Sequence, residues 1–227
     1  MINNLIFDFD GIIIDTESTE FISWREIFHE HGCELKQEVW VDCIGRPHGY
    51  FDPFAHLEDL TRQVVDRMAI NSKRRDRVKA LNNAMPILPG VENLIAEAKE
   101  RNFGIGVVSS STRSWVHGHL DRLGLLPDFD AIICKEDTLR HKPDPDPYLA
   151  VLDQLKSRPN QAVVFEDSPP GIHSAKAAGI LCVLIPSPMT RHMAFDMADL
   201  HLESLADISL EFLLDRFSGK SPFTFTA

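Results

Sequence analysis

The chain has few cysteines, and no two of them are close together. Its 227 residues contain four cysteines and no Cys-x-x-Cys pair. This excludes a zinc ribbon, a thioredoxin-type redox site and a disulfide framework. We therefore expect reduced, mostly buried thiols at Cys33, Cys43, Cys134 and Cys182.

Long apolar runs and an excess of positive charge are also absent. No apolar stretch approaches the roughly 18 residues of a transmembrane helix. The apolar N-terminal segment lacks basic residues and is interrupted by Asp8 and Asp10, which does not fit a secretory signal. A net charge of −11 repels nucleic acids and anionic lipids. We expect a cytoplasmic protein that binds small molecules rather than nucleic acid or membranes, and the sequence leaves its oligomeric state open.

Short apolar segments alternate with helical patterns over most of the chain. Apolar residues recur with helical spacing over 91–98, 115–123 and 148–155. A repeated strand, helix, strand order needs right-handed crossovers and builds a parallel sheet covered by helices. The sequence thus predicts a doubly wound α/β core with buried strands at 5–9, 103–108, 131–134, 162–165 and 180–185.

The alternation stops between residues 16 and 85, where only helical signals are found. They cover 21–28, 39–44, 57–69 and 72–83. We interpret 16–85 as an inserted helical domain and residues 1–15 and 86–227 as the core. The alternative is that these helices pack directly on one face of the sheet. The last residues, 218–227, are rich in Ser, Pro and Thr, and we expect a loose tail.

Two acidic pairs follow predicted strands. Asp8 and Asp10 end the first strand, before Gly11, and side chains at i and i+2 of an extended chain point the same way. Glu166 and Asp167 end a later strand, and ligands of open α/β sheets bind at that edge. Either pair alone is also typical of a solvated loop. Together, such carboxylates repel one another unless a cation lies between them, and Mg²⁺ prefers oxygen ligands.

Two further segments offer groups that suit a phosphate. Ser109 ends a predicted strand before a helix, where a hydroxyl and backbone N–H groups can bind an anion, although this segment can also simply cap the helix. Lys142 lies among prolines that stiffen its loop, although a single lysine is usually solvated. The chain has no GxxxxGK[ST] loop, and Gly104-x-Gly106 lies inside a strand, which does not fit a dinucleotide fingerprint.

These four segments, in this order at strand ends, resemble the motifs of the haloacid dehalogenase superfamily of phosphohydrolases. Asp8-Phe9-Asp10-Gly11 matches the first motif, Ser109 the second, Lys142 the third and Glu166-Asp167 the fourth. The resemblance extends to the branch with an inserted helical cap, which includes β-phosphoglucomutase-like enzymes and phosphoglycolate and sugar-phosphate phosphatases. It implies a Rossmann-like core and a Mg²⁺-dependent phosphatase acting on a small phosphorylated metabolite.

The resemblance also implies a role for each motif residue. Asp8 is the expected nucleophile, which forms an aspartyl-phosphate, and Asp10 the expected general acid and base. Asp8, the backbone carbonyl of Asp10, Asp167 and, with it, Glu166 are the expected Mg²⁺ ligands. The resemblance assigns the phosphoryl oxygens to Ser109 and Lys142.

In the expected cap, Arg46 is our candidate substrate contact because a guanidinium can bind a second anionic group through two hydrogen bonds. His48, His56 and Arg62 compete for this role, and Arg46 can equally serve only to stabilise its loop.

Two other functions fit parts of the pattern. A β-phosphoglucomutase-like isomerase would return the phosphoryl group to the sugar, but Glu20 lies in the segment where such mutases present a histidine. A phospho-accepting signalling module also combines acids, a hydroxyl and a lysine on a doubly wound sheet, but it lacks an inserted helical domain.

Overall fold

The computed structural model describes residues 1–41, 51–191, 193 and 195–218. The chain divides into two compact units. The first, here called the core unit, comprises Met1–Ile14, Pro86–Ser187 and Met193–Ala227, and the second, the helical unit, comprises Asp15–Met85 and Pro188–His192. No helix among the described residues is long and apolar enough to cross a membrane.

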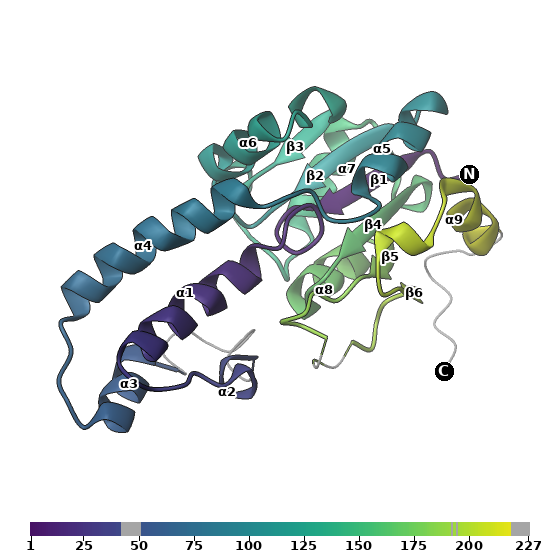
Figure 1. The fold of residues 1–227 in the computed structure, drawn as a ribbon. Helices are drawn as coiled ribbons and strands as arrows, with labels where there is room; N and C mark the ends of the chain where they lie inside the picture. The colour runs from purple at the N-terminus through teal and green to yellow at the C-terminus, as the bar shows by residue number, and fades with distance from the viewer. Residues whose placement is uncertain (42–50, 192, 194, 219–227) are drawn as a thin grey trace. The chain divides into compact units, whose positions relative to one another are not determined.

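The core unit is built on a six-stranded sheet whose strand pairs are all parallel (Figure 1). The order is β3-β2-β1-β4-β5-β6, which confirms the predicted doubly wound parallel α/β fold. The sequence did not indicate the sixth strand, because two residues are too short for a pattern. The strands are β1 (Asn4–Asp8), β2 (Gly104–Val108), β3 (Ala131–Ile133), β4 (Ala162–Glu166), β5 (Leu181–Leu184) and β6 (Leu200–His201).

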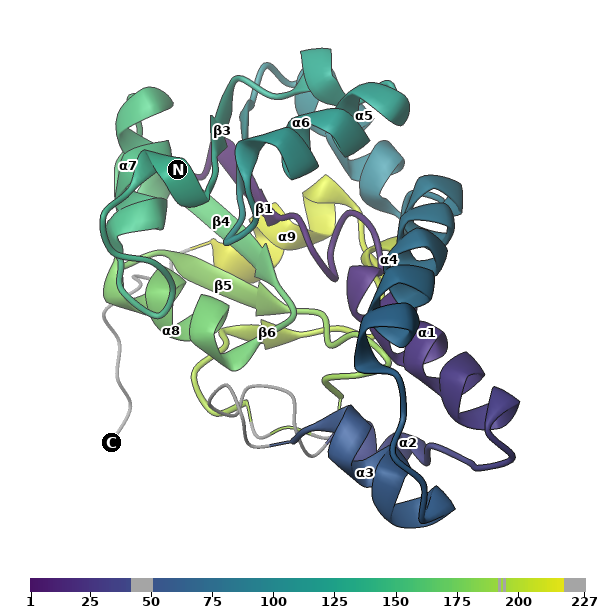
Figure 2. The same ribbon diagram turned by 90° about the vertical axis from the view of Figure 1, so that its left-hand side faces the viewer.

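Helices cover both faces of this sheet (Figure 2). On one face, α7 and α8 pack with alternate strand residues such as Ile6 and Val164 in a single buried cluster. On the other, α5 contacts β2 and α9. The helices of the core unit are α5 (Val91–Glu100), α6 (Arg113–Arg122), α7 (Asp146–Gln154), α8 (Pro169–Ala177) and α9 (Leu210–Phe217), with short 3-10 turns η1 (Leu126–Asp128), η2 (Lys135–Asp137), η3 (Pro159–Gln161) and η4 (Leu205–Asp207).

The strand register brings the motif segments to one edge of the sheet. Asp8 is paired with Val108, the residue before Ser109, and Phe7 is paired with Phe165, the residue before Glu166. Because parallel strands all end at the same edge, segments that are 100 or more residues apart in the chain become neighbours there.

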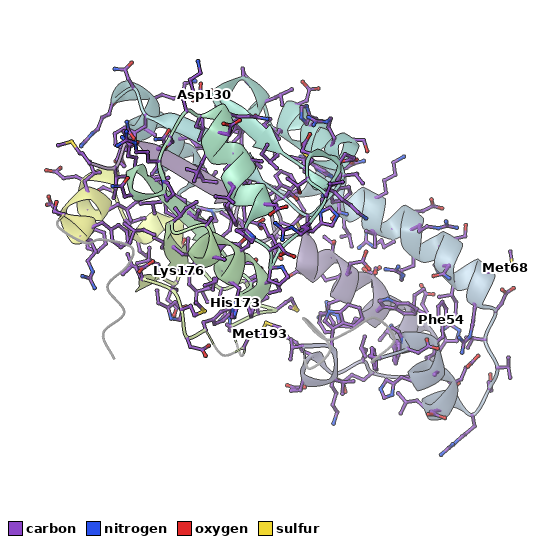
Figure 3. The ribbon with its side chains drawn as sticks, turned by 180° about the vertical axis from the view of Figure 1, so that it is seen from behind. Phe54, Met68, Asp130, His173, Lys176 and Met193 are labelled. Atoms are coloured by element: carbon purple, nitrogen blue, oxygen red, sulfur yellow. The ribbon has the colours of Figure 1, made fainter. Side chains whose placement is uncertain are left out.

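The described residues of the helical unit form four helices around their own apolar core. Phe54 of α3, labelled in Figure 3, lies edge-on against Trp24 of α1 with ring centroids 4.9 Å apart. Met189, from the segment after β5, also packs into this core, which no sequence pattern indicated. The helices are α1 (Thr16–Glu30), α2 (Gln37–Val41), α3 (Pro53–Thr61) and α4 (Arg67–Ala84).

The prediction of one helical segment over 57–69, followed by another over 72–83, is wrong. The first helix ends at Thr61, since Arg62 adopts a left-handed conformation with φ of 59°. The next begins after Asp66, whose carboxylate accepts hydrogen bonds from the backbone N–H groups of Met68 and Ala69, each at 3.0 Å. The apolar spacing therefore spans two helices, and this N-cap sets where the second one begins.

Candidate active site

Three buried carboxylates gather where β1 and β4 end. Asp8, Glu166 and Asp167 each place an oxygen within 4.8 Å of the others. Among the described residues, these three carboxylates form the group that could hold a metal ion. All three are buried, with Glu166 fully inaccessible. These donors suit a hard divalent cation, because all of them are oxygen atoms. Their combined negative charge is also larger than the positive charge of Lys142, which lies beside them.

Lys142 is the cation already present at this cluster. Its Nζ donates to Asp8 Oδ1 at 2.5 Å and to Glu166 Oε1 at 2.6 Å, and it also donates to the carbonyl of Val108 at 3.2 Å. Burial opposes its charge, but Asp8 and Glu166 outweigh this and raise the pKa of Lys142 above its ordinary value. The ammonium is thus held charged and fixed next to Asp8.

The environment of Asp8 disfavours its charged form when no cation is bound. Burial is the largest influence and raises the pKa of Asp8 well above its ordinary range, while Lys142 acts in the opposite direction. The carboxylates of Glu166 and Asp10 add repulsion. A bound divalent cation would oppose these effects by stabilising the carboxylate form.

Glu166 is held by donors on both of its oxygens. Besides Lys142, Oε1 accepts the hydroxyl of Tyr148 at 2.7 Å, while Oε2 accepts the backbone N–H groups of Asp167 at 3.1 Å and of Ser168 at 3.3 Å and the Ser168 hydroxyl at 3.1 Å. A Cβ at Gly171 would overlap this carboxylate, which explains the glycine in the first turn of α8. Ser168 also caps that helix, because its hydroxyl accepts the backbone N–H of Gly171.

Sequence reasoning missed the role of Tyr148. Tyr148 fits the predicted apolar helix face over 148–155, and its ring is fully buried on α7. The one available signal was the hydroxyl itself, since a buried tyrosine needs a hydrogen-bond partner.

The Asp10 carboxylate faces a different set of partners. Oδ2 accepts the hydroxyl of Ser109 at 3.1 Å and that of Ser111 at 2.7 Å, and Oδ1 accepts the indole N–H of Trp115 at 3.2 Å. Asp8 and Asp10 would point the same way only if the chain stayed extended through Asp10, but β1 ends at Asp8. The two carboxylates of the first motif therefore have different neighbours.

The turn after β1 requires its glycine. Gly11 has φ of +93°, a conformation that side-chain-bearing residues rarely adopt, and a Cβ there would overlap the Asp167 carboxylate. Gly11 thus lets the first and fourth motif segments approach each other closely.

The cap candidates are only partly described. Arg46 and its competitor His48 lie outside the described residues. In the helical unit, His56 lies against the rings of Phe28 and Phe51, each at 5.6 Å between centroids, and Arg62 ends α3.

The comparison with known families agrees with this arrangement. The model of the haloacid dehalogenase-like hydrolases matches residues 5–185. The chain belongs to this family. This confirms the family and the hydrolase class that the four motifs indicate.

Individual relatives support the same assignment. "Putative phosphatase YhcW" of Bacillus subtilis (strain 168) is 39% identical over 221 residues, covering 97% of this chain and 100% of the relative. "Beta-phosphoglucomutase" of the same organism is 29% identical over 217 residues, covering 92% of each chain. The crystal structure of CbbY from Rhodobacter sphaeroides in complex with phosphate is 28% identical, with a TM-score of 0.70, covering 93% of this chain and 98% of that one.

Proposed function

We propose that this protein is a Mg²⁺-dependent phosphatase that hydrolyses a small phosphomonoester through an aspartyl-phosphate. The observation that carries this proposal is the buried contact between Asp8 and Lys142, 2.5 Å apart, beside a second acidic pair. A nucleophilic carboxylate and a fixed ammonium are the two groups that in-line phosphoryl transfer most needs from a protein. The similarity to a named phosphatase supports the same reaction.

In the first step, a carboxylate oxygen of Asp8 attacks phosphorus, and the bond from phosphorus to the leaving oxygen breaks. Lys142 stabilises the charge on the transferring phosphoryl oxygens, because its ammonium is already fixed beside Asp8. Ser109 follows β2 at the same sheet edge, where its hydroxyl donates to Asp10 Oδ2 at 3.1 Å. We propose that this hydroxyl turns to donate to another of these phosphoryl oxygens when substrate binds, while Ser111 and Trp115 continue to hold Asp10.

Asp10 handles the proton in both halves of the reaction. It gives a proton to the leaving alkoxide while Asp8 becomes phosphorylated. It then takes a proton from the water that attacks the aspartyl-phosphate, which releases phosphate and restores both carboxyl groups. Its separate hydrogen-bond partners suit this task, because Asp10 must act without competing with Asp8 as nucleophile.

We propose that Asp8, Asp167 and the backbone carbonyl of Asp10 hold the Mg²⁺. Glu166 was the fourth predicted ligand, and it lies in the same cluster. Because its oxygens already accept five donors, we propose that it acts chiefly by fixing Lys142. When bound, the cation supplies charge neutralisation between the nucleophile and the phosphoryl group.

Substrate choice is assigned to the helical unit, acting as a cap that excludes water and reads the leaving group. Arg46 remains our candidate for a second anionic group. The substrate class is a small phosphorylated metabolite.

The residue Glu20 and its ion pair favour hydrolysis over the mutase reaction. Its carboxylate forms an ion pair with Arg74 of α4 within the helical unit. Glu20 lies in the segment 16–21, where the mutases present a histidine and this chain has none. Conversion of β-glucose 1-phosphate to glucose 6-phosphate by the protein would instead support the mutase.

The test is the rate of phosphate release from a panel of small monoesters, with Mg²⁺ and with a chelator. We expect metal-dependent hydrolysis that Asp8→Asn reduces by at least about a thousandfold, since the amide is a poor nucleophile. Asp153→Asn, an exposed aspartate on α7, is the matched control and should retain the wild-type rate. Equal activity of Asp8→Asn and the wild type would refute the covalent route.

A further inference from the structure

Three donors to the Asp10 carboxylate come from one short segment. Ser109 and Ser111 lie between β2 and α6, and Trp115 lies in the first turn of α6. The two hydroxyls bind Oδ2, at 3.1 and 2.7 Å, and the indole N–H binds Oδ1, at 3.2 Å. With a donor on each oxygen, the plane of this carboxylate is fixed from the α6 side.

The indole of Trp115 is itself held in place. Its ring meets that of His119, one helical turn later, edge-on with centroids 4.4 Å apart. His119 is buried, its Nδ1 lies 3.3 Å from a guanidinium nitrogen of Arg122, and its other ring neighbour is Phe9, at 6.3 Å. The half-buried Trp115 is therefore packed against a side chain that cannot move freely.

The chemistry of an indole limits what Trp115 can do there. Its nitrogen is a donor only, so it can bind the Asp10 carboxylate but cannot take up or deliver the proton itself. An indole also has only two rotatable side-chain bonds, so little freedom is lost in holding one position. Trp115 is thus suited to orient an acceptor and unsuited to act as an acid.

We propose that Trp115 is a positioning residue, whose N–H orients the Asp10 carboxyl group for proton transfer to the leaving oxygen. This proposal rests on the role of Asp10 in the proposed function. It assigns a function to a residue of α6 that sequence reasoning used only as part of a helix face.

The decisive measurement compares leaving groups. An alkyl phosphate needs a proton on its leaving oxygen, whereas the nitrophenolate of p-nitrophenyl phosphate leaves without one. Trp115→Phe keeps the aromatic packing and removes the N–H. A misplacement of a catalytic group by about 1 Å lowers the reaction rate by up to roughly a hundredfold. We therefore expect Trp115→Phe to lower kcat/KM for the best alkyl substrate about tenfold or more. The same variant should lower kcat/KM for p-nitrophenyl phosphate by less than about threefold, since that step needs no acid.

Two serine variants serve as the comparison. Ser111→Ala removes a donor to the other oxygen of Asp10 and should show the same selective loss. Ser114→Ala is the control, because its exposed hydroxyl lies 3.2 Å from that of Thr112, and it should change neither substrate. Thermal unfolding of each variant checks that the fold is intact.

An equal loss with both substrates would overturn the proposal, because it would indicate a structural role for Trp115. No loss with either would overturn it too. Failure of the proposed function looks different, since the wild type would then release no phosphate, or Asp10→Asn would fail to discriminate between the two leaving groups.

Discussion

Tyr148 supplies one of the five donors on the buried carboxylate of Glu166, at 2.7 Å. Tyr148→Phe removes this donor and leaves the ring, which lies 5.1 Å from the Lys142 ammonium, in place. The substitution removes a single oxygen atom from the buried side chain. The variant therefore tests chiefly the hydrogen bond.

The expected magnitude follows from the charge and burial of Glu166. A hydrogen bond to a charged group contributes about 1.5 to 3 kcal/mol, and Glu166 has no access to water that could replace the lost donor. For a chain of this size, each kcal/mol lowers the melting temperature by about 2 to 4 °C, so the shift should be about 3 to 12 °C. The four remaining donors keep the loss below that of an unpaired buried charge.

Urea and thermal unfolding are the assays, with Mg²⁺ and with a chelator, following the transition of the core unit separately from that of the helical unit where the two resolve. A double-mutant cycle with Glu166→Gln isolates the Tyr148 to Glu166 coupling. A loss of less than about 0.5 kcal/mol in the free energy of unfolding, with no coupling to Glu166, would refute the reasoning, because it would show that the hydroxyl contributes almost nothing.

Two further predictions concern Gly11, in the turn after β1, and the buried thiol of Cys134. Gly11→Ala should destabilise the fold by at least about 1 kcal/mol and weaken Mg²⁺ binding, because its methyl group displaces Asp167; an unchanged Mg²⁺-induced shift in melting temperature would contradict this. Burial raises the pKa of Cys134 from 9.0 to about 11, so the folded state keeps a proton that the unfolded chain loses between these values. The stability contributed by this thiol is full below pH 9 and is lost as the pH rises to 11. The wild type should therefore lose more unfolding free energy than Cys134→Ala between pH 8 and 10.5. Equal losses in the two proteins would contradict this prediction.

Much of the core fold could be predicted from the sequence. The ends of the five longer strands lie within one residue of the expected segments, because parallel strands buried on both faces form short continuous apolar runs. The helical unit was less predictable. Its α3 and α4 share one apolar spacing, and the break between them depends on the local geometry at Arg62 and on the Asp66 cap.

The site divides in the same way. The convergence of Asp8, Glu166 and Asp167 follows from a single rule, since all parallel strands end at one edge of the sheet. The partners of Asp10 did not follow from any such rule. They depend on where β1 stops being extended and on how α6 orients its first turn.

The sequence by itself determined which polar motif follows which strand, the family, and the residue types available for phosphoryl transfer. These features depend only on apolar periodicity and on the order of residues along the chain. Only the tertiary structure decided which oxygen each donor holds. Tyr148 and Glu166 lie 18 residues apart, and Trp115 and Asp10 lie 105 apart. Their contacts are set by helix rotation and packing on the sheet, which no local pattern encodes.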